Sequence, residues 1–453
     1  MSSYRYYQRR KNRIMTFQKI ILKLIILVML WTLANPLAFA DQSLPPGKNL
    51  LKKKILKNGL TLIYQIDESS AITALHILFR GGKKAAPPGK RGLSYLTTRL
   101  AVEIPDRGKV QALMRLASRT SLSSKGDYTF IKIACLSETL EETLKIMSKI
   151  MTDPLFSGLR INWIKELMLN IKKTEEDNPL NVAHNAHLET LLAEKNYGGS
   201  VFGTEDSLKE IEKKDIVNFY NNYFRGGNMI ATVSSNLEEE ELLKICTKYL
   251  KEFPEGTPPQ SKPESFSRKE DRKIFIEKET KQSVVSLAFP LPKLTTRNFT
   301  LAFLLETLLG KGVGSKLWPL RSKEKLAYNV DSRATPMIEG GILEAYLETD
   351  NKKKETAMEA LKKVLDELFE EGVTEEELEV TKIQSKAIFL RDNETKEAKT
   401  LNLAAFEALG LGYEFLNTFS KEIETITLEE INAYIKDVLN PEKGMEVIVG
   451  SKR

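Results

Sequence analysis

Three histidines are the side chains of this sequence best suited to bind a metal ion or to move a proton near neutral pH. His184 and His187 are three residues apart in a segment with helical spacing, and Glu189 follows them, so the three could hold a metal ion together. The same residues fit an ordinary polar helix face, and two histidines alone are a weak signal. A metal site there is therefore only an alternative. His76, between Leu75 and Ile77, is expected to be structural.

The chain has two cysteines, too few for a disulfide framework. Cys135 lies in the strand-like run 128–136, and Cys246 lies on the apolar side of the helical run 238–250. A thiol nucleophile needs a neighbouring base, and the sequence places no histidine beside either thiol. We expect two buried thiols, although pairing between them stays open.

A glycine-rich run contains Gly310, Gly312 and Gly314. Such a run can form a phosphate-binding loop, but only when a Lys-Ser or Lys-Thr pair opens the next helix at the required spacing. That pair is missing here. The run is therefore a poor signal for nucleotide binding.

Hydrophobic periodicity predicts the elements that must position these side chains. The dipeptide Asn58-Gly59 between two apolar runs predicts a β-hairpin. Runs rich in β-branched residues predict further strands, and longer runs with apolar residues every three or four positions predict helices. The predicted strands cover residues 55–66, 72–79, 128–136, 284–289, 327–333 and 341–348, and the predicted helices cover residues 140–151, 161–174, 354–371, 375–390 and 398–409.

Residues 254–272 interrupt the periodicity with four prolines and many polar residues, which predicts an exposed linker. A helix and strand before it, at 216–220 and 228–233, resemble a helix and strand that end the chain, at 431–435 and 444–449. This indicates two copies of one unit. Strands and helices come in blocks without βαβ alternation, so we expect an α+β fold of two homologous halves, each a mainly antiparallel sheet with helices on one face.

Residues 1–40 are typical of a signal peptide, with basic residues, an apolar run and then Ala38-Phe39-Ala40. They carry the whole excess charge of +7, and a neutral remainder gives no electrostatic case for nucleic-acid binding. No later apolar run is long enough to span a membrane. We expect export from the cytoplasm, most simply to a bacterial periplasm, with a retained membrane anchor as the alternative. The predicted domains are residues 41–253 and 273–453.

The order of elements and several motifs resemble the insulinase/pitrilysin family of zinc metallopeptidases over nearly the whole chain after residue 40. In that family a glycine-rich strand end leads to a helix that opens Gly-x-Ala-His-x-x-Glu-His. The two histidines bind zinc and the glutamate is the general base. Here Gly81-Gly82 are followed by Gly92-Leu93-Ser94-Tyr95-Leu96-Thr97-Thr98-Arg99. Aligned on Gly92, the three functional positions hold Tyr95, Thr98 and Arg99.

These replacements remove the zinc chemistry that the resemblance would otherwise imply. A catalytic zinc needs three protein donors and an open position for water. Arg99 carries a permanent positive charge that repels a dication, and Thr98 cannot take a proton from water near neutral pH. The family's third ligand, a glutamate on a later helix, is expected near Asn170 or Ile171, and neither has a carboxylate. We expect no metal and no catalytic residue on this chain.

The second half keeps more of the family's pattern. The glycine-rich run at residues 310–314 leads to Arg321 and Tyr328, with Lys325 at a position where the family has glycine. The resemblance implies that Arg321 and Tyr328 reach across to the other half or to a partner chain, where they hold the substrate backbone and stabilise an oxyanion. A guanidinium and a phenol can both donate hydrogen bonds to a peptide carbonyl.

The resemblance therefore implies a non-catalytic, substrate-binding subunit of a heterodimeric zinc metallopeptidase that acts on peptides or unfolded small proteins. Zinc would be bound by a catalytic partner chain of the same family, and pairing of peptide backbone with a strand edge would give broad specificity. Two alternatives remain. One is an inactive family member that serves as a binding or assembly protein, and the other is a hydrolase that uses a metal site around His184, His187 and Glu189.

Overall fold

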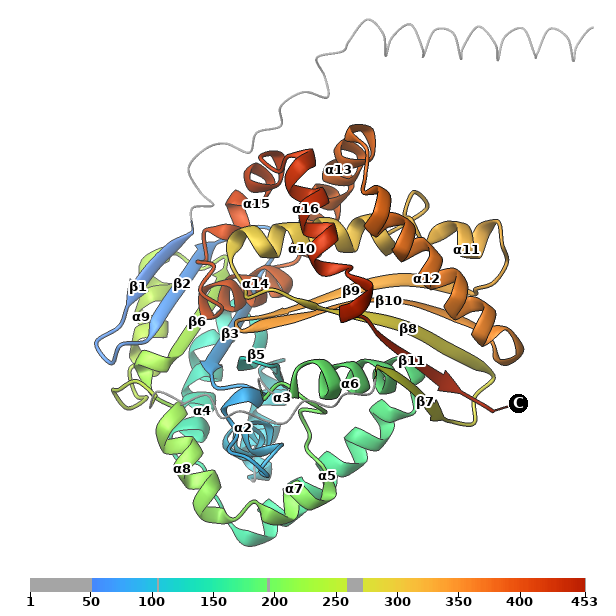
Figure 1. The fold of residues 1–453 in the computed structure, drawn as a ribbon. Coiled ribbons are helices and arrows are strands. Elements are labelled where there is room, and N and C mark those ends of the chain that lie inside the picture. Colours follow the sequence, from blue (N-terminus) through green and yellow to red (C-terminus); the bar gives the residue numbers. More distant parts are fainter. Residues whose placement is uncertain (1–50, 104–105, 194–195, 259–271, 453) are drawn as a thin grey trace, which may run out of the picture. The chain divides into compact units, whose positions relative to one another are not determined.

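Each half of the chain builds one β-sheet (Figure 1). The structure, a computed structural model, describes residues 51–103, 106–193, 196–258 and 272–452, which all belong to one compact unit. The predicted signal segment, residues 1–40, and residues 259–271 of the predicted linker lie outside the described residues. Among the described helices, none is both long and apolar enough to cross a bilayer.

The first sheet has six strands in the order β1-β2-β6-β3-β5-β4. All neighbours are antiparallel except β2 and β6. The predicted hairpin at Asn58-Gly59 joins β1 to β2, and Gly59 has a φ of +86°, which glycine adopts without strain. The strands are β1 (Lys52–Ile55), β2 (Thr61–Ile66), β3 (Ile72–Arg80), β4 (Arg119–Ser124), β5 (Tyr128–Leu136) and β6 (Met229–Ser235).

The second sheet repeats this plan with five strands in the order β7-β11-β8-β10-β9. Its neighbours are antiparallel except β7 and β11. Each sheet has one parallel pair of strands. In each pair the strand that comes later in the sequence, β6 or β11, follows the helix of the repeated motif. These observations confirm the predicted α+β fold of two similar halves. The strands are β7 (Lys273–Glu277), β8 (Gln282–Leu291), β9 (Asn329–Met337), β10 (Gly340–Asp350) and β11 (Met445–Gly450).

The helices begin at polar side chains that satisfy the free backbone N–H groups of their first turns. Thr374 accepts a hydrogen bond from the backbone of Glu377, whose side chain accepts one from the Thr374 backbone. The helices of the first half are α2 (Leu93–Val102), α3 (Arg107–Arg115), α4 (Leu140–Thr152), α5 (Gly158–Glu176), α6 (Pro179–Leu191), α7 (Glu205–Glu210), α8 (Lys213–Tyr223) and α9 (Glu239–Leu250). Those of the second half are α10 (Thr296–Gly310), α11 (Trp318–Ser322), α12 (Lys354–Glu371), α13 (Glu375–Asp392), α14 (Lys396–Ala408), α15 (Phe415–Glu424) and α16 (Leu428–Val438).

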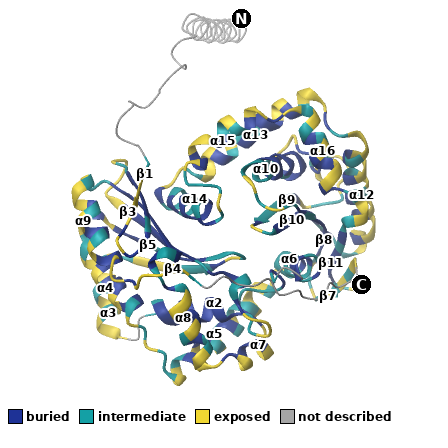
Figure 2. Cartoon of the chain, turned by 60° about the vertical axis from the view of Figure 1, so that its left-hand side comes forward, coloured by how far each residue is buried: buried dark blue, intermediate teal, exposed yellow. Residues whose placement is uncertain are grey.

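One helix from each half packs on the sheet of the other half (Figure 2). Helix α6 precedes the linker but packs on β8, β10 and β11, where Ala183 joins Val284 and Val447 in one apolar cluster. Helix α14 follows the linker but packs on β3 and β6, where Ala404 joins Leu78. Apolar periodicity did not predict this exchange, because it shows that a helix face is buried but not which sheet covers it.

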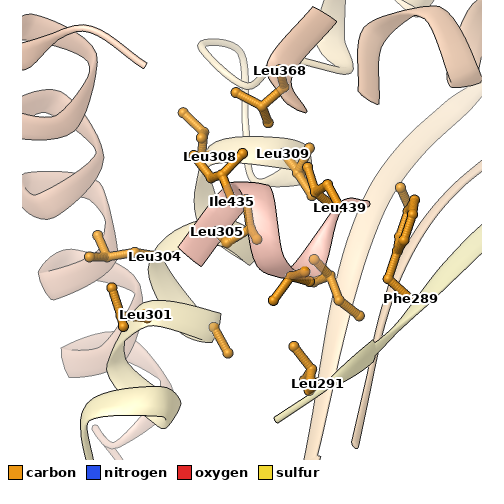
Figure 3. Close-up of a cluster of buried hydrophobic side chains, with 14 of the residues drawn as sticks. Phe289, Leu291, Leu301, Leu304, Leu305, Leu308, Leu309, Leu368, Ile435 and Leu439 are labelled. Atoms are coloured by element: carbon orange, nitrogen blue, oxygen red, sulfur yellow. The ribbon is translucent and has the colours of Figure 1, made fainter. Parts of the chain in front are cut away.

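The core of the second half fixes the helix that leads into the glycine-rich run. Leucines of α10 pack against Ile435 of α16, against Leu439 just after it, and against Phe289 and Leu291 of β8 (Figure 3). All of these side chains are buried. The end of α10, and with it the start of the glycine-rich run, is therefore held in place by packing. The labelled leucines of α10 are Leu301, Leu304, Leu305, Leu308 and Leu309.

Candidate functional site

Helix α2 carries Tyr95, Thr98 and Arg99, and all three side chains contribute to the structure of the first half. The Tyr95 ring is buried and meets the Phe202 ring edge to face, with 4.7 Å between their centroids. The Thr98 hydroxyl donates a hydrogen bond to the Ser94 carbonyl at 2.9 Å. The Arg99 guanidinium pairs with the Glu103 carboxylate at 3.7 Å, one turn later.

These side chains do not fit a zinc ion. Tyr95 and Arg99 are neighbours on α2, and Arg99 lines a second cavity that shares Leu122 of β4 with the cavity of Tyr95. The donors that zinc prefers are imidazole, thiolate and carboxylate, and none of the three positions supplies one. Across the part of the chain that the structure describes, no group of three or more His, Cys, Asp or Glu side chains is arranged to hold a metal.

Helix α5 places a carboxylate beside Tyr95, about one turn beyond the place that the sequence alignment indicated. Asn170 is exposed and Ile171 is half-buried, whereas Glu175 lines the same cavity as Tyr95. Burial raises the pKa of both Tyr95 and Glu175. The alignment considered only Asn170 and Ile171, which have no carboxylate, and the structure adds Glu175 one turn later as the acidic residue of α5 on this cavity. One carboxylate beside a tyrosine and an arginine still does not make a zinc site.

A cavity of about 490 Å³ lies between the two halves at this point. Its walls come from several elements far apart in the sequence: the segment after β3, helix α2, the turn from β4 to β5, helices α5 and α6, and strand β9. The charged residues on these walls are Lys83, Lys125, Glu175 and Arg333, with His184 beside them. The volume lies within the range of ligand-binding pockets.

His184 belongs to a polar cluster around the buried Glu344 that links α6 to the second sheet. Its Nδ1 lies 2.6 Å from Oε2 of Glu344 on β10, and Nε of Arg333 on β9 donates to the same oxygen at 2.9 Å. The Glu344 side chain is fully buried. Burial alone would raise the pKa of Glu344, but the hydrogen bond with His184 and the charge of Arg333 outweigh it and lower the pKa to about 2.

The three residues of the alternative metal site point to three different partners. His184 contacts Glu344, while Nε2 of the buried His187 lies 2.9 Å from the Ser286 hydroxyl. Glu189 accepts a hydrogen bond from Arg91 at 2.8 Å. Burial lowers the pKa of His187 to about 4, so its imidazole is neutral at physiological pH. This geometry gives the metal alternative no support.

Sequence reasoning missed Lys83, Arg333 and Glu344. For Glu344 a signal was present, because this carboxylate interrupts an otherwise apolar strand, and a charge in such a place must be paired when it is buried. Lys83 and Arg333 carry no comparable signal. His76 agrees with the structural role expected of it, since it is buried under α14 and its Nδ1 lies 2.9 Å from the Thr400 hydroxyl.

The glycine-rich run serves packing at one end and a turn at the other. A Cβ atom on Gly310 would lie 2.2 Å from the backbone nitrogen of Ser332, so only glycine lets α10 approach β9 this closely. Gly312 has a φ of +88°, and both Gly312 and Gly314 are exposed. The ammonium group of Lys311, which lies between Gly310 and Gly312 in the sequence, pairs with the Asp331 carboxylate at 2.9 Å.

Arg321 and Tyr328 are exposed, and the structure does not bring them to the cavity. The Arg321 guanidinium lies over the Trp318 ring, 5.0 Å from its centroid. Tyr328 is 58% exposed and precedes Arg333 by five positions, which along a strand corresponds to about 16 Å. Within this chain the two side chains are therefore free to contact a group from outside.

Lys325 occupies a backbone conformation that favours glycine, with a φ of +54°. This explains why the resembling family has glycine at that position.

The variant Lys325→Gly is expected to raise the free energy of unfolding by about 0.5–1 kcal/mol, because it removes the clash of a Cβ atom in the left-handed region. Chemical denaturation would measure the gain. Lys323→Gly, two residues earlier with a φ of −100°, is the matched control and should give no gain; equal effects of both would contradict this account.

Both cysteines are buried, and they do not form a disulfide with each other. Burial raises the pKa of Cys135, and it raises that of Cys246 to about 12. The reactive form of a cysteine is the thiolate, which such pKa values disfavour. Neither thiol is suited to act as a nucleophile.

Comparison with known proteins supports the predicted resemblance. Residues 210–385 match the family model of the peptidase M16 inactive domain. The chain is 23% identical over 393 residues to YmxG of Helicobacter pylori, a non-peptidase homolog, covering 85% of this chain and 91% of that protein. It is 20% identical over 411 residues to YmxG of Bacillus subtilis, an uncharacterized zinc protease, covering 88% and 98%.

Two solved structures share the fold. A peptidase M16 inactive domain from Pseudomonas fluorescens superposes with a TM-score of 0.80 at 21% identity, covering 89% of this chain and 98% of that one. A protease from Helicobacter pylori gives a TM-score of 0.80 at 17% identity, covering 89% and 100%. The two-sheet architecture therefore recurs over the full length of both structures.

Proposed function

We propose that this chain is the non-catalytic, substrate-binding subunit of a heterodimeric zinc metallopeptidase. The reason is that it carries the inactive domain of the M16 peptidases, which are the insulinase/pitrilysin family. The partner is a chain of the same family with an intact His-x-x-Glu-His motif, which binds the zinc. This chain holds the substrate, an extended peptide or an unfolded small protein. The name of the Helicobacter pylori relative, a non-peptidase homolog, agrees with a chain that has no activity of its own.

The observation that carries this proposal is a contrast between the two halves. In the first half, Tyr95, Thr98 and Arg99 contribute to packing and pairing and offer zinc no donor. In the second half, Arg321 lies over the Trp318 ring at the surface, and Tyr328 is largely exposed. A guanidinium and a phenol on an exposed face are available to donate hydrogen bonds to a peptide carbonyl held by another chain.

Strand β4 supports peptide binding on this chain. It is the last strand of the first sheet, and among the described strands it pairs with β5 alone, so its other edge has no strand beside it there. An extended peptide can add to such an edge through backbone hydrogen bonds, which do not depend on its sequence. Leu122 and Ser123 of β4 also line the cavity between the halves.

An assembly or binding protein without any role in hydrolysis is the second candidate. The fold is also similar to that of a chain in complex III2 from Candida albicans, with a TM-score of 0.75 at 18% identity. In this case the partner's activity would not depend on Arg321 or Tyr328. The same experiment therefore separates the two candidates.

The test is to mix the purified chain with a family chain that has the intact zinc motif, and to measure cleavage of an unfolded peptide. We expect zinc-dependent cleavage by the pair and none by this chain alone. Arg321→Ala and Tyr328→Phe should each lower the kcat of the pair by about 100-fold, the typical effect of removing one oxyanion donor.

Lys323→Ala is the matched control, because Lys323 is exposed on the same segment as Arg321. It should leave the activity of the pair unchanged. Full activity of the isolated chain would contradict the proposed function. Full activity of the pair with both Arg321→Ala and Tyr328→Phe would favour the assembly protein.

A further inference from the structure

Three basic residues and one carboxylate line the cavity between the two halves, and of the three basic residues Arg333 is already paired with the buried Glu344. Lys83, Lys125 and Arg333 line it, and Glu175 is the single carboxylate among the described residues that do so. The three basic residues come from three places: the 3-10 turn after β3, the turn from β4 to β5, and strand β9. Basic groups that converge from separate elements on one cavity make it favourable for an anion.

Lys83 is the most unusual of these groups because its ammonium group is almost completely buried. The residue is 5% exposed, and its Nζ donates a hydrogen bond to the Gly199 carbonyl at 2.6 Å. An ammonium group has three N–H donors, and a buried charge is costly unless it is paired. Glu189 favours the charged form of Lys83, and an anion in the cavity would add a second counter-charge.

The apolar part of the cavity wall indicates what the anion is attached to. Leu122, Leu188, Val201, Phe202 and Met337 line the same space as the basic groups. The cavity also begins at β4, the open sheet edge along which an extended peptide can pair. An apolar wall beside basic groups, at the end of a strand edge, suits the last residue of a peptide.

We propose that this cavity binds the carboxyl-terminal end of a peptide, with the terminal carboxylate at Lys83, Lys125 and Arg333 and the last side chain against the apolar wall. This inference rests on the proposed function and deepens it, since it names the part of the substrate that this chain holds. A C-terminal carboxylate is recognised by charge and by hydrogen-bond donors. The site therefore discriminates between a free end of a peptide and an internal segment.

Proton uptake on binding follows from the burial of Lys83. Burial, and then the charge of Arg91, lower the pKa of Lys83 to about 7, while Glu189 opposes them. The other titratable or charged groups on the cavity walls are Tyr95, Lys125, Glu175, His184 and Arg333. Slightly above pH 7 much of Lys83 is neutral, and a bound carboxylate favours its charged form. Binding should therefore take up protons and weaken as the pH rises above 7.

The experiment is calorimetric titration of the full chain with a short unstructured peptide that ends in leucine, as the free acid and as the C-terminal amide. We expect the free acid to bind at least about tenfold more tightly, which corresponds to about 1.4 kcal/mol. Lys125→Met should remove most of this preference. Lys173→Met, an exposed lysine on α5 outside the cavity, is the control and should keep it.

Binding heats in two buffers of different ionisation enthalpy give the number of protons taken up. The native chain should take up protons near pH 7.5, and Lys83→Met should abolish the uptake. Equal affinity for acid and amide, an unchanged preference in Lys125→Met, or displacement of the peptide by an equal concentration of inorganic phosphate would each overturn the inference. If the amide binds as tightly as the free acid, the carboxylate site is wrong but the proposed function is not contradicted. The proposed function is tested separately, by the activity of the mixed pair.

Discussion

Replacing Glu344 by glutamine is expected to lower the free energy of unfolding by about 2–3 kcal/mol, the usual cost of losing hydrogen bonds to a buried charged group. The substitution keeps the shape of the side chain but removes its charge. Arg333, which is partly exposed, then loses its carboxylate partner, and the hydrogen bond with His184 loses its ionised acceptor. Denaturant unfolding followed by circular dichroism would measure the loss.

Glu348→Gln is the matched control for this experiment. Glu348 lies four residues further along β10 and is half-buried, and its carboxylate accepts one hydrogen bond, from Asn329 at 3.4 Å. We expect a change of less than about 0.5 kcal/mol there. Equal losses for the two variants would mean that the cluster of His184, Arg333 and Glu344 has no special role in joining α6 to the second sheet.

Acidification from pH 8 to pH 5 is expected to destabilise the protein by about 4 kcal/mol through two buried histidines, or about 2 kcal/mol for each. Burial, and then the charge of Lys132, lower the pKa of His76 to about 3. Burial lowers that of His187 to about 4. In the unfolded chain both histidines return to a pKa near 6.5.

The sign follows from proton binding in the two states. Between pH 6.5 and pH 4 the unfolded chain binds protons that the folded chain does not, so stability is complete above pH 6.5 and is lost as the pH falls. His76 lies under α14 and His187 belongs to α6, the two exchanged helices. Acid therefore weakens the two places where the halves hold each other.

Unfolding free energies measured across this pH range would test the effect. His76→Gln and His187→Gln should each remove about half of the loss, and the double variant should be nearly insensitive to pH above 5. These comparisons use the slope of the unfolding free energy against pH, so they do not depend on the absolute stability of each variant. A double variant that loses as much stability as the native chain would assign the acid sensitivity to other groups.

Much of the local structure could be predicted from the sequence because it depends on neighbouring residues. Strand β5 and helix α12 begin and end where the pattern of apolar residues placed them, and α13 begins at Glu375, the first residue of the predicted helix. Lys325 shows the limit of such reasoning. The sequence identified it as a replacement of glycine, but only the backbone shows the left-handed conformation that glycine would relieve.

The sequence by itself predicted much of the secondary structure and the division into two similar halves, and its resemblance to the zinc metallopeptidases implied the loss of zinc ligands at Tyr95, Thr98 and Arg99. These are properties of side-chain chemistry and of short-range periodicity, which need no knowledge of distant contacts. Only the tertiary structure decided that α6 and α14 exchange sheets, that His184 meets Glu344, and that Lys83, Lys125 and Arg333 surround one cavity. Such contacts join residues far apart in the chain, and apolar periodicity specifies burial without specifying the partner.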